Sequence, residues 1–274
     1  MTEPLTRNPH QGHTPGQHAP GTPCWASLLV HDLAEGQEFY HQLFGWEFSS
    51  GPRQLGRYVR ATLDGREVAG LGEITPGRRL RVAWLPYMAS DDVDATADLI
   101  RERGGTVAVG PLDAEDAGRM AIAADPAGAN FGVWHAARHR GLRPAEAGAP
   151  GTPVWHELVT REATSAGHFY PGVFGYEPGP TPQSPAGLDR LTLHLDGTPV
   201  AGIQGAGEAL PHESGPYWKT YFAVGDTDAA VRRVHELGGR VLSEPEDSPH
   251  GRVATFADPE GAQFSVIAPA PAPA

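Results

Sequence analysis

The spacing of apolar residues predicts short strands and amphipathic helices in alternation along most of the chain. Residues 25–30 (WASLLV) form a β-rich apolar run, and residues 33–44 then carry apolar side chains at helical spacing. Asp32 stands where it can cap this helix, and Gly45 follows its last turn. Residues 129–134 (ANFGVW) alternate in polarity, which predicts a final strand entered from a tight Asp-Pro-x-Gly turn.

The same order of elements occurs twice. The segment GTPCWASLLVHDLAEGQEFYHQLFGW starts at Gly21, and GTPVWHELVTREATSAGHFYPGVFGY starts at Gly151, 130 residues later. Later matches, which end in ADPAGANFGVW and ADPEGAQFSVI, keep offsets between 130 and 134 residues. Such small differences belong in loops, so one unit has been duplicated. In the second copy Pro171 lies inside the first helical stripe, which predicts that this helix is kinked or shortened.

The repeat divides the chain into five parts. We predict a disordered tail at residues 1–20, a first module at 21–136, a linker at 137–150, a second module at 151–268 and a disordered tail at 269–274. The tails have too few large apolar side chains to fold, and the linker is polar and rich in Gly and Pro. His135, His139 and Arg140, where the linker begins, are expected to be exposed.

Composition narrows the classes of function. The formal net charge of −12 disfavours nucleic acid, because proteins that bind it carry basic patches. No apolar run approaches the roughly 20 residues of a membrane span, and the N-terminus lacks the apolar core of a secretory signal. The single cysteine, Cys24, can form no internal disulfide and is interpreted as a small buried core residue. We therefore expect a cytoplasmic protein that binds a small molecule, with neither nucleic acid nor membrane as partner.

Motifs that occur in the same order in both copies resemble the vicinal oxygen chelate superfamily of glyoxalase, bleomycin-resistance and extradiol-dioxygenase proteins. These motifs are FYHQLFGW and FYPGVFGY, DDVDATADLIRERGG and GDTDAAVRRVHELGG, and the two GR…DP.GA.F endings. The resemblance covers about residues 21–268, and it is to the fused two-module actinobacterial type labelled glyoxalase-like or hydroxylase. It implies an α+β fold of two tandem βαβββ modules. Their mixed sheets curl into half-barrels, with helices on the convex face and a ligand on the concave face.

In the metal-using members of this superfamily, three side chains of the concave face hold a divalent ion. By this resemblance the ligand positions fall on Trp25, Leu85 and Gly132 in the first module and on Trp155, Lys219 and Ser265 in the second, with Leu85 and Lys219 placed to within one residue. None of the six is a His, Asp, Glu or Cys, the side chains that usually bind divalent ions. The expectation is therefore no metal at either position, and no cofactor.

Strand alternation indicates which side chains line the concave face in place of a metal. We predict an apolar cleft with a few polar groups, lined by Trp25, Tyr87, Trp134, Trp155, Lys219, Tyr221 and Ser265. Glu157 and His194 are the candidates for acid or base catalysis. Glu157 could instead form a salt bridge with Lys219, and His194 could be hydrogen-bonded scaffold.

The leading hypothesis is a metal-independent protein that binds, and could sequester, an aromatic or otherwise apolar metabolite or antibiotic. The alternative is a metal-free enzyme of secondary metabolism, such as an isomerase, a cyclase or a hydroxylase-like catalyst. A metal-dependent lyase or dioxygenase is a third hypothesis, against which the six ligand positions count. The sequence leaves open whether the chain is an enzyme, and both a monomer and a homodimer are compatible with a fused pair of modules.

Overall fold

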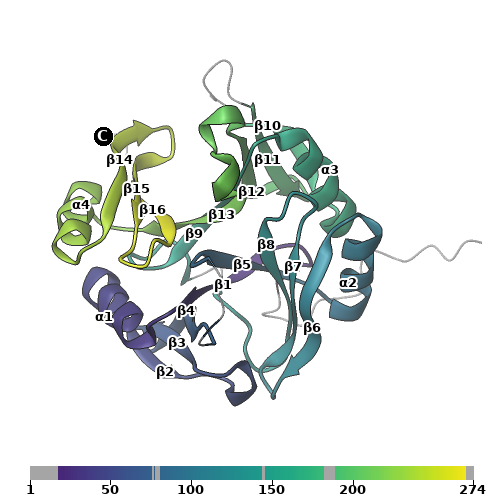
Figure 1. Cartoon of the computed structure of the whole chain (residues 1–274), viewed down its shortest axis with the longest axis horizontal. Helices are drawn as coiled ribbons and strands as arrows, with labels where there is room; N and C mark the ends of the chain where they lie inside the picture. The colour runs from purple at the N-terminus through teal and green to yellow at the C-terminus, as the bar shows by residue number, and fades with distance from the viewer. Residues whose placement is uncertain (1–17, 76, 78–80, 144–145, 182–188, 270–274) are drawn as a thin grey trace, which may run out of the picture.

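Two eight-stranded mixed sheets and four α-helices make up the part of the chain that the computed structural model describes, which is residues 18–75, 77, 81–143, 146–181 and 189–269 (Figure 1). Each sheet belongs to one of the two repeats, as the sequence predicts. The expected tails at 1–20 and 269–274 fall mostly outside the described residues. Within the described residues, no helix has both the length and the apolar character needed to cross a bilayer.

The first sheet is built from two βαβββ units. The first unit is β1 (Pro23–Val30), α1 (Leu33–Phe44), β2 (Glu47–Ser50), β3 (Tyr58–Leu63) and β4 (Arg66–Glu73), with a 3-10 turn η1 (Arg53–Leu55). The second unit is β5 (Trp84–Ala89), α2 (Val93–Glu102), β6 (Thr106–Ala114), β7 (Gly118–Ala124) and β8 (Asn130–Ala136). The strand order is β2-β3-β4-β1-β5-β8-β7-β6, so β1 and β5 pair antiparallel at the centre.

The second sheet repeats this plan, and each module therefore contains a pair of βαβββ units. Its first unit is β9 (Pro153–Thr160), α3 (Ala163–Phe174), β10 (Glu177–Pro180), β11 (Asp189–Leu195) and β12 (Thr198–Gly205). Its second unit is β13 (Tyr217–Ala223), α4 (Thr227–Glu236), β14 (Arg240–Ser248), β15 (Gly251–Ala257) and β16 (Gln263–Pro269). Two 3-10 turns, η3 (Gly207–Ala209) and η4 (His212–Ser214), lie between these units. The order is β10-β11-β12-β9-β13-β16-β15-β14.

The helix signals in the sequence are confirmed at α1. The Asp32 side chain accepts hydrogen bonds from the N–H groups of Ala34 and Glu35, and Gly45 ends the helix in the left-handed conformation with φ 73°. Helices α1 and α3 are both twelve residues long, so the part of the expectation that Pro171 shortens α3 is wrong. Pro171 lies in the last turn, where its missing N–H removes a single helix hydrogen bond.

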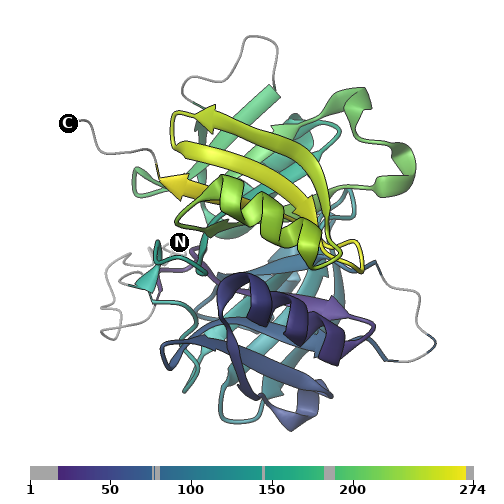
Figure 2. The same cartoon turned by 90° about the vertical axis from the view of Figure 1, so that its left-hand side faces the viewer.

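The two modules share their hydrophobic cores. In Figure 1, α1 faces α4 on one side of the molecule and α2 faces α3 on the other, and Figure 2 shows α1 and α4 next to each other. The ring centroids of Phe39 in α1 and Phe264 in β16 are 6.4 Å apart. On the opposite side, those of Phe131 in β8 and Tyr170 in α3 are 5.4 Å apart. Because each core contains side chains from both modules, we expect the modules to unfold together.

Hydrogen bonds also join the modules at the two Asp-Pro turns. The hydroxyl of Tyr40 in α1 donates to Asp258 of the second module at 3.0 Å and accepts from Nε1 of Trp84 at 3.1 Å. Burial raises the pKa of the Asp258 carboxyl and holds the pKa of Tyr40 well above its ordinary value. The same arrangement is formed on the other side of the molecule by Tyr170, Asp125 and Trp218. The repeated segment is therefore a joint between modules as well as a turn.

Candidate functional site

The candidate residues of the second module meet on the face of the second sheet that carries no helix, which we call the second inner face. Strand pairing places Glu157 opposite Lys219, Trp155 opposite Tyr221, and Ser265 beside Tyr221. Side chains that alternate with them, such as Leu158 and Trp218, lie in the buried core under the helices. The alternation read from the sequence thus assigns the two faces of these strands correctly.

A charged group lies at the centre of the second inner face. The Lys219 ammonium is 3.3 Å from Oε2 of Glu157, and the Tyr221 hydroxyl donates to the same oxygen at 2.8 Å. The side chains of Lys219 and Glu157 are only 12% and 9% exposed. Burial and the neighbouring Glu157 carboxylate hold the pKa of Tyr221 well above its ordinary value, so the phenol stays a donor. Glu157 thus forms the salt bridge that was one of its two expected roles.

His194, the other candidate for acid or base catalysis, lies at the edge of this face. Its Nδ1 is 3.2 Å from the carbonyl oxygen of Glu177 on the neighbouring strand β10. Within the described residues it makes no hydrogen bond or ion pair with Glu157. The contact with the Glu177 carbonyl fits the second role expected for His194, that of a hydrogen-bonded scaffold residue.

The inner face of the first sheet, in contrast, is filled by its own side chains. Trp25, Tyr87 and Trp134 are 6%, 8% and 7% exposed and pack in one apolar cluster. The hydroxyl of Tyr58 accepts a hydrogen bond from Nε1 of Trp25 at 3.0 Å and lies 2.8 Å from the Ser27 hydroxyl. The three binding residues predicted in the first module are therefore enclosed, and a ligand reaches them only if this cluster opens.

The start of the linker closes the same cluster. His139 was expected to be exposed, but it is 8% exposed, and its ring centroid lies 4.4 Å from that of Trp25. Its carbonyl oxygen accepts from Nε1 of Trp134, and its Nδ1 is 2.6 Å from Oε2 of Glu67. The expectation was wrong because the polar composition of a segment does not reveal a half-buried carboxylate partner, here Glu67, that is distant in the sequence.

The first module has Gly132 where the second has Ser265, because side chains such as Tyr87 fill the inner face of the first sheet, which we call the first inner face. A Cβ on Gly132 would lie 2.1 Å from the Tyr87 ring, so only glycine admits this ring. In the second module the Ser265 hydroxyl pairs with that of Thr255 at 2.8 Å. Tyr221 directs its hydroxyl to Glu157 and leaves room for the serine.

The variant Gly132→Ser is expected to lower the free energy of unfolding by about 2 kcal/mol, because extra atoms forced into a packed core cost roughly 1–3 kcal/mol. Urea unfolding followed by tryptophan fluorescence measures this. The reverse change, Ser265→Gly, removes one hydrogen bond without a collision and should cost about 1 kcal/mol. Wild-type stability of Gly132→Ser would contradict the packing of Tyr87 on Gly132.

Arg190 belongs to the second inner face but was missed in the sequence. On β11 it lies opposite Gln204 of β12, and its Nη2 donates to Oε1 of Gln204 at 3.2 Å. When the two LDG turns are aligned, Arg190 takes the place of Tyr58 in the first module. Alignment of the two copies could have identified Arg190, because it shows a cation in the second copy where the first has an aromatic residue.

The donor chemistry of these positions does not fit a divalent ion. The six superfamily ligand positions carry indole, alkyl, hydroxyl and ammonium groups or no side chain, and the nearby Glu157 is paired with an ammonium that would repel a metal cation. Within the described residues, no three His, Cys, Asp or Glu side chains are grouped so that they could hold an ion.

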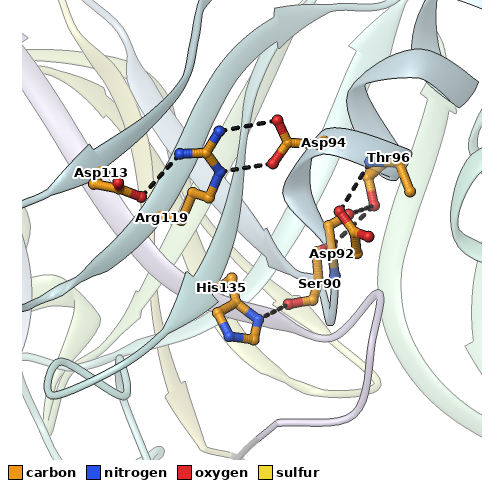
Figure 3. Close-up of polar contacts among 8 residues, drawn as sticks. Ser90, Asp92, Asp94, Thr96, Asp113, Arg119 and His135 are labelled. Atoms are coloured by element: carbon orange, nitrogen blue, oxygen red, sulfur yellow. Dashed lines mark hydrogen bonds and ion pairs between the residues drawn. The ribbon is translucent and has the colours of Figure 1, made fainter.

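A second polar cluster lies on the first sheet (Figure 3). Arg119 of β7 donates from Nε and Nη2 to Asp94 at 2.7 and 2.9 Å, and from Nη1 to Asp113 at 2.8 Å. In the same view, Nδ1 of His135 lies 2.9 Å from the carbonyl oxygen of Ser90. The second module forms the arginine cluster again with Arg252, Asp228 and Asp247. Because both copies build it between a helix and the sheet, we interpret this cluster as scaffold.

Two family models match the chain, one in each repeat. The model described as "Glyoxalase/Bleomycin resistance protein/Dioxygenase superfamily" matches residues 23–133, and the one described as "Glyoxalase-like domain" matches residues 156–267. The chain belongs to the glyoxalase/bleomycin resistance protein/dioxygenase superfamily. The resemblance read from the repeated motifs is therefore confirmed, and with it the α+β fold of two tandem modules.

Relatives within this superfamily extend over nearly the whole chain. The "Anthracycline biosynthesis protein DnrV" of Streptomyces peucetius is 40% identical over 267 residues, which cover 91% of this chain and 94% of that protein. The "Putative glyoxylase CFP32" of Mycobacterium tuberculosis is 37% identical over 261 residues, which cover 93% of this chain and 97% of that protein. The fused pair of modules is thus shared with both relatives.

Solved structures of superfamily members share the fold. The Mn(II)-bound glyoxalase of Novosphingobium aromaticivorans aligns with a TM-score of 0.60 at 17% identity, over 92% of this chain and 89% of that one. The 2,2',3-trihydroxybiphenyl 1,2-dioxygenase of Sphingomonas wittichii gives 0.60 at 16% identity, over 91% of both chains. At such identities the likeness concerns the fold alone.

Proposed function

We propose that this chain binds an aromatic or largely apolar small molecule at the second inner face without a metal ion. The observation that carries the proposal is the Lys219–Glu157 pair, with the Tyr221 hydroxyl on the same carboxylate oxygen. By the resemblance to metal-using superfamily members, Lys219 stands at a metal-ligand position, and Glu157 lies opposite it. An ammonium group has no lone pair for a metal. Trp155 and Tyr221 lie opposite each other and offer aromatic area to a ring.

The relatives support an aromatic ligand from secondary metabolism. DnrV is described as an anthracycline biosynthesis protein, and it shares the fused two-module chain. Anthracyclines are fused-ring aromatic compounds, which suit a face that offers Trp155 and Tyr221. A polycyclic aromatic metabolite is therefore the ligand class that we propose first.

A metal-free enzyme is the second candidate, and the bond from Tyr221 to Glu157 favours it. A phenol that donates to a largely buried carboxylate beside an ammonium is an arrangement through which a proton can be moved. Glu157→Gln separates the two functions, because it removes the carboxylate but keeps its shape. Retained binding with lost conversion of the compound would assign Glu157 a catalytic role, whereas binding with no conversion in the wild-type protein supports sequestration.

The absence of a metal and the presence of a ligand are tested on protein purified without a tag and without chelator. We expect no stoichiometric divalent ion by elemental analysis. In a thermal-shift screen of aromatic natural products, a true ligand should stabilise the protein by about 2.7 kcal/mol at 100 times its Kd. The shift should be lost in Trp155→Ala, while the exposed variant Arg252→Gln should keep it. A divalent ion bound at one equivalent per chain would contradict the proposal.

A further inference from the structure

Comparison of the two modules shows that the second inner face lacks a hydroxyl group that is present in the first module. In the first module Gly70 leaves space for the Tyr58 hydroxyl, and a Cβ on Gly70 would lie 1.8 Å from that oxygen. This oxygen accepts the hydrogen bond from Nε1 of Trp25. The second module keeps the glycine, as Gly202, but has Arg190 where the first has Tyr58. The second module therefore keeps the space above this glycine but has no tyrosine hydroxyl to occupy it.

Trp155 is left with a free N–H group by this exchange. Five of the six tryptophans donate their Nε1 hydrogen to a protein oxygen, namely Trp25, Trp46, Trp84, Trp134 and Trp218. Across the described residues Trp155 makes no such bond, although it is half-buried. A Cβ on Gly202 would lie 3.3 Å from Nε1 of Trp155 and 3.5 Å from Cγ of Glu157, so this N–H lies over the glycine.

Arg190 supplies a second free donor and a positive charge. Its Nε is buried and has no hydrogen-bond partner among the described residues, where the guanidinium forms no ion pair either. Arg190 pairs with Gln204, and Gln204 pairs with Val159, so the Arg190 side chain lies on the same side of the sheet as Glu157, two residues before Val159. Arg190 on β11 and Lys219 on β13 thus place two cations on the same side of the sheet as the Glu157 carboxylate of β9.

We infer that the ligand of the second module carries an acidic oxygen, as a carboxylate or an ionised phenol, at the place that corresponds to the Tyr58 hydroxyl of the first module. Nε1 of Trp155 and the guanidinium of Arg190 donate to this oxygen, and Lys219 adds attraction. The aromatic part of the ligand lies against Trp155 and Tyr221. This inference rests on the proposed function and narrows its ligand class to acidic aromatic compounds.

Calorimetric titration of the full chain with two matched probes tests the acidic oxygen. Anthraquinone-2-carboxylate carries the charge, and anthraquinone-2-carboxamide has the same rings without it. We expect the carboxylate to bind at least 10-fold more tightly, since hydrogen bonds to charged groups contribute roughly 10- to 100-fold in affinity. Arg190→Gln should remove this preference and change the affinity of the amide by less than about 3-fold. The control Arg252→Gln, which removes an exposed arginine of the same module, should leave both affinities unchanged.

Two further variants test the place of the oxygen. Trp155→Phe keeps an aromatic ring but loses the N–H, and we expect it to weaken both probes, because both present an oxygen acceptor. Arg190→Tyr copies the first module, and a tyrosine over Gly202 should block both probes while circular dichroism shows a folded chain. Equal affinities of the two probes for wild-type protein, a preference that survives Arg190→Gln, or unweakened binding in Trp155→Phe would each overturn the inference and leave the proposed function intact. Failure of both probes to bind wild-type protein would contradict the proposed function itself.

Discussion

The variant Asp258→Ala is expected to lower the free energy of unfolding by about 3 kcal/mol, because it leaves two buried donors without a partner. Asp258 accepts from the Tyr40 hydroxyl at 3.0 Å and from the N–H of Ala262 at 2.8 Å. Tyr40 and Ala262 are fully buried, so water cannot replace the carboxylate. Each unsatisfied buried group costs about 1–3 kcal/mol. Part of this loss is offset, because burial disfavours the charged carboxylate, as its raised pKa shows. Urea unfolding measures the change.

Glu260→Ala is the matched control for this variant. The Glu260 carboxylate also joins the modules, since it accepts from the N–H groups of His31 and Asp32 at 2.6 and 2.8 Å. These bonds lie at the exposed surface, where such interactions contribute at most about 1 kcal/mol. Asp125→Ala should behave like Asp258→Ala, because Asp125 makes the corresponding bond with Tyr170. If Asp258→Ala were no less stable than Glu260→Ala, the buried joint would not hold the modules together.

Acidification from pH 6.5 to pH 4 is expected to remove about 3 kcal/mol of stability through His156. The imidazole is 6% exposed, and burial lowers its pKa from 6.5 to about 4. The unfolded chain therefore binds a proton in this window while the folded chain does not. The stabilising contribution is complete above pH 6.5 and is lost as the pH falls through the folded pKa. The carboxyls of Asp125 and Asp258, whose pKa values are raised by burial, act in the opposite direction.

The contribution of His156 is isolated by comparison with His156→Gln. Glutamine can keep a hydrogen bond with the Thr220 hydroxyl, which lies 3.1 Å from Nδ1 of His156, but it does not titrate. Urea unfolding of both proteins at several values between pH 7 and pH 4 should show a stability difference that shifts in favour of the variant as the pH falls. Parallel pH profiles would contradict a buried neutral imidazole. The first module has Ala26 at the position that corresponds to His156, so the fold does not require an ionisable side chain there.

The duplicated units could be predicted from the sequence because the signals are local. The left-handed Gly45 and the stripe of α1 recur as Gly175 and α3, and they predict the right elements, although Glu162, at the place of the Asp32 cap, makes no side-chain cap hydrogen bond. The sharing of cores between modules could not be predicted in this way. The apolar stripe that carries Phe39 is the same whether it packs on its own sheet alone or also on Phe264 of the other module. Such a pattern predicts which face of the helix is buried, but it does not predict which module that face packs against.

The candidate site was predictable only as far as strand alternation reaches. Alternation places Glu157 and Lys219 on one face, and the structure shows their ion pair. The structure also places Tyr58 on the inner face of the first sheet, and alternation does not reveal that its hydroxyl reaches over Gly70 to Trp25. The filling of the first inner face and the free donors of the second depend on this contact, which becomes visible only in three dimensions.

We propose that the second inner face binds an acidic aromatic molecule in place of a metal ion. Calorimetric titration of the full chain with anthraquinone-2-carboxylate, in buffer with and without EDTA, tests this proposal. We expect one binding site per chain, with the same affinity under both conditions. Binding that is abolished by EDTA and restored by a divalent ion would contradict it.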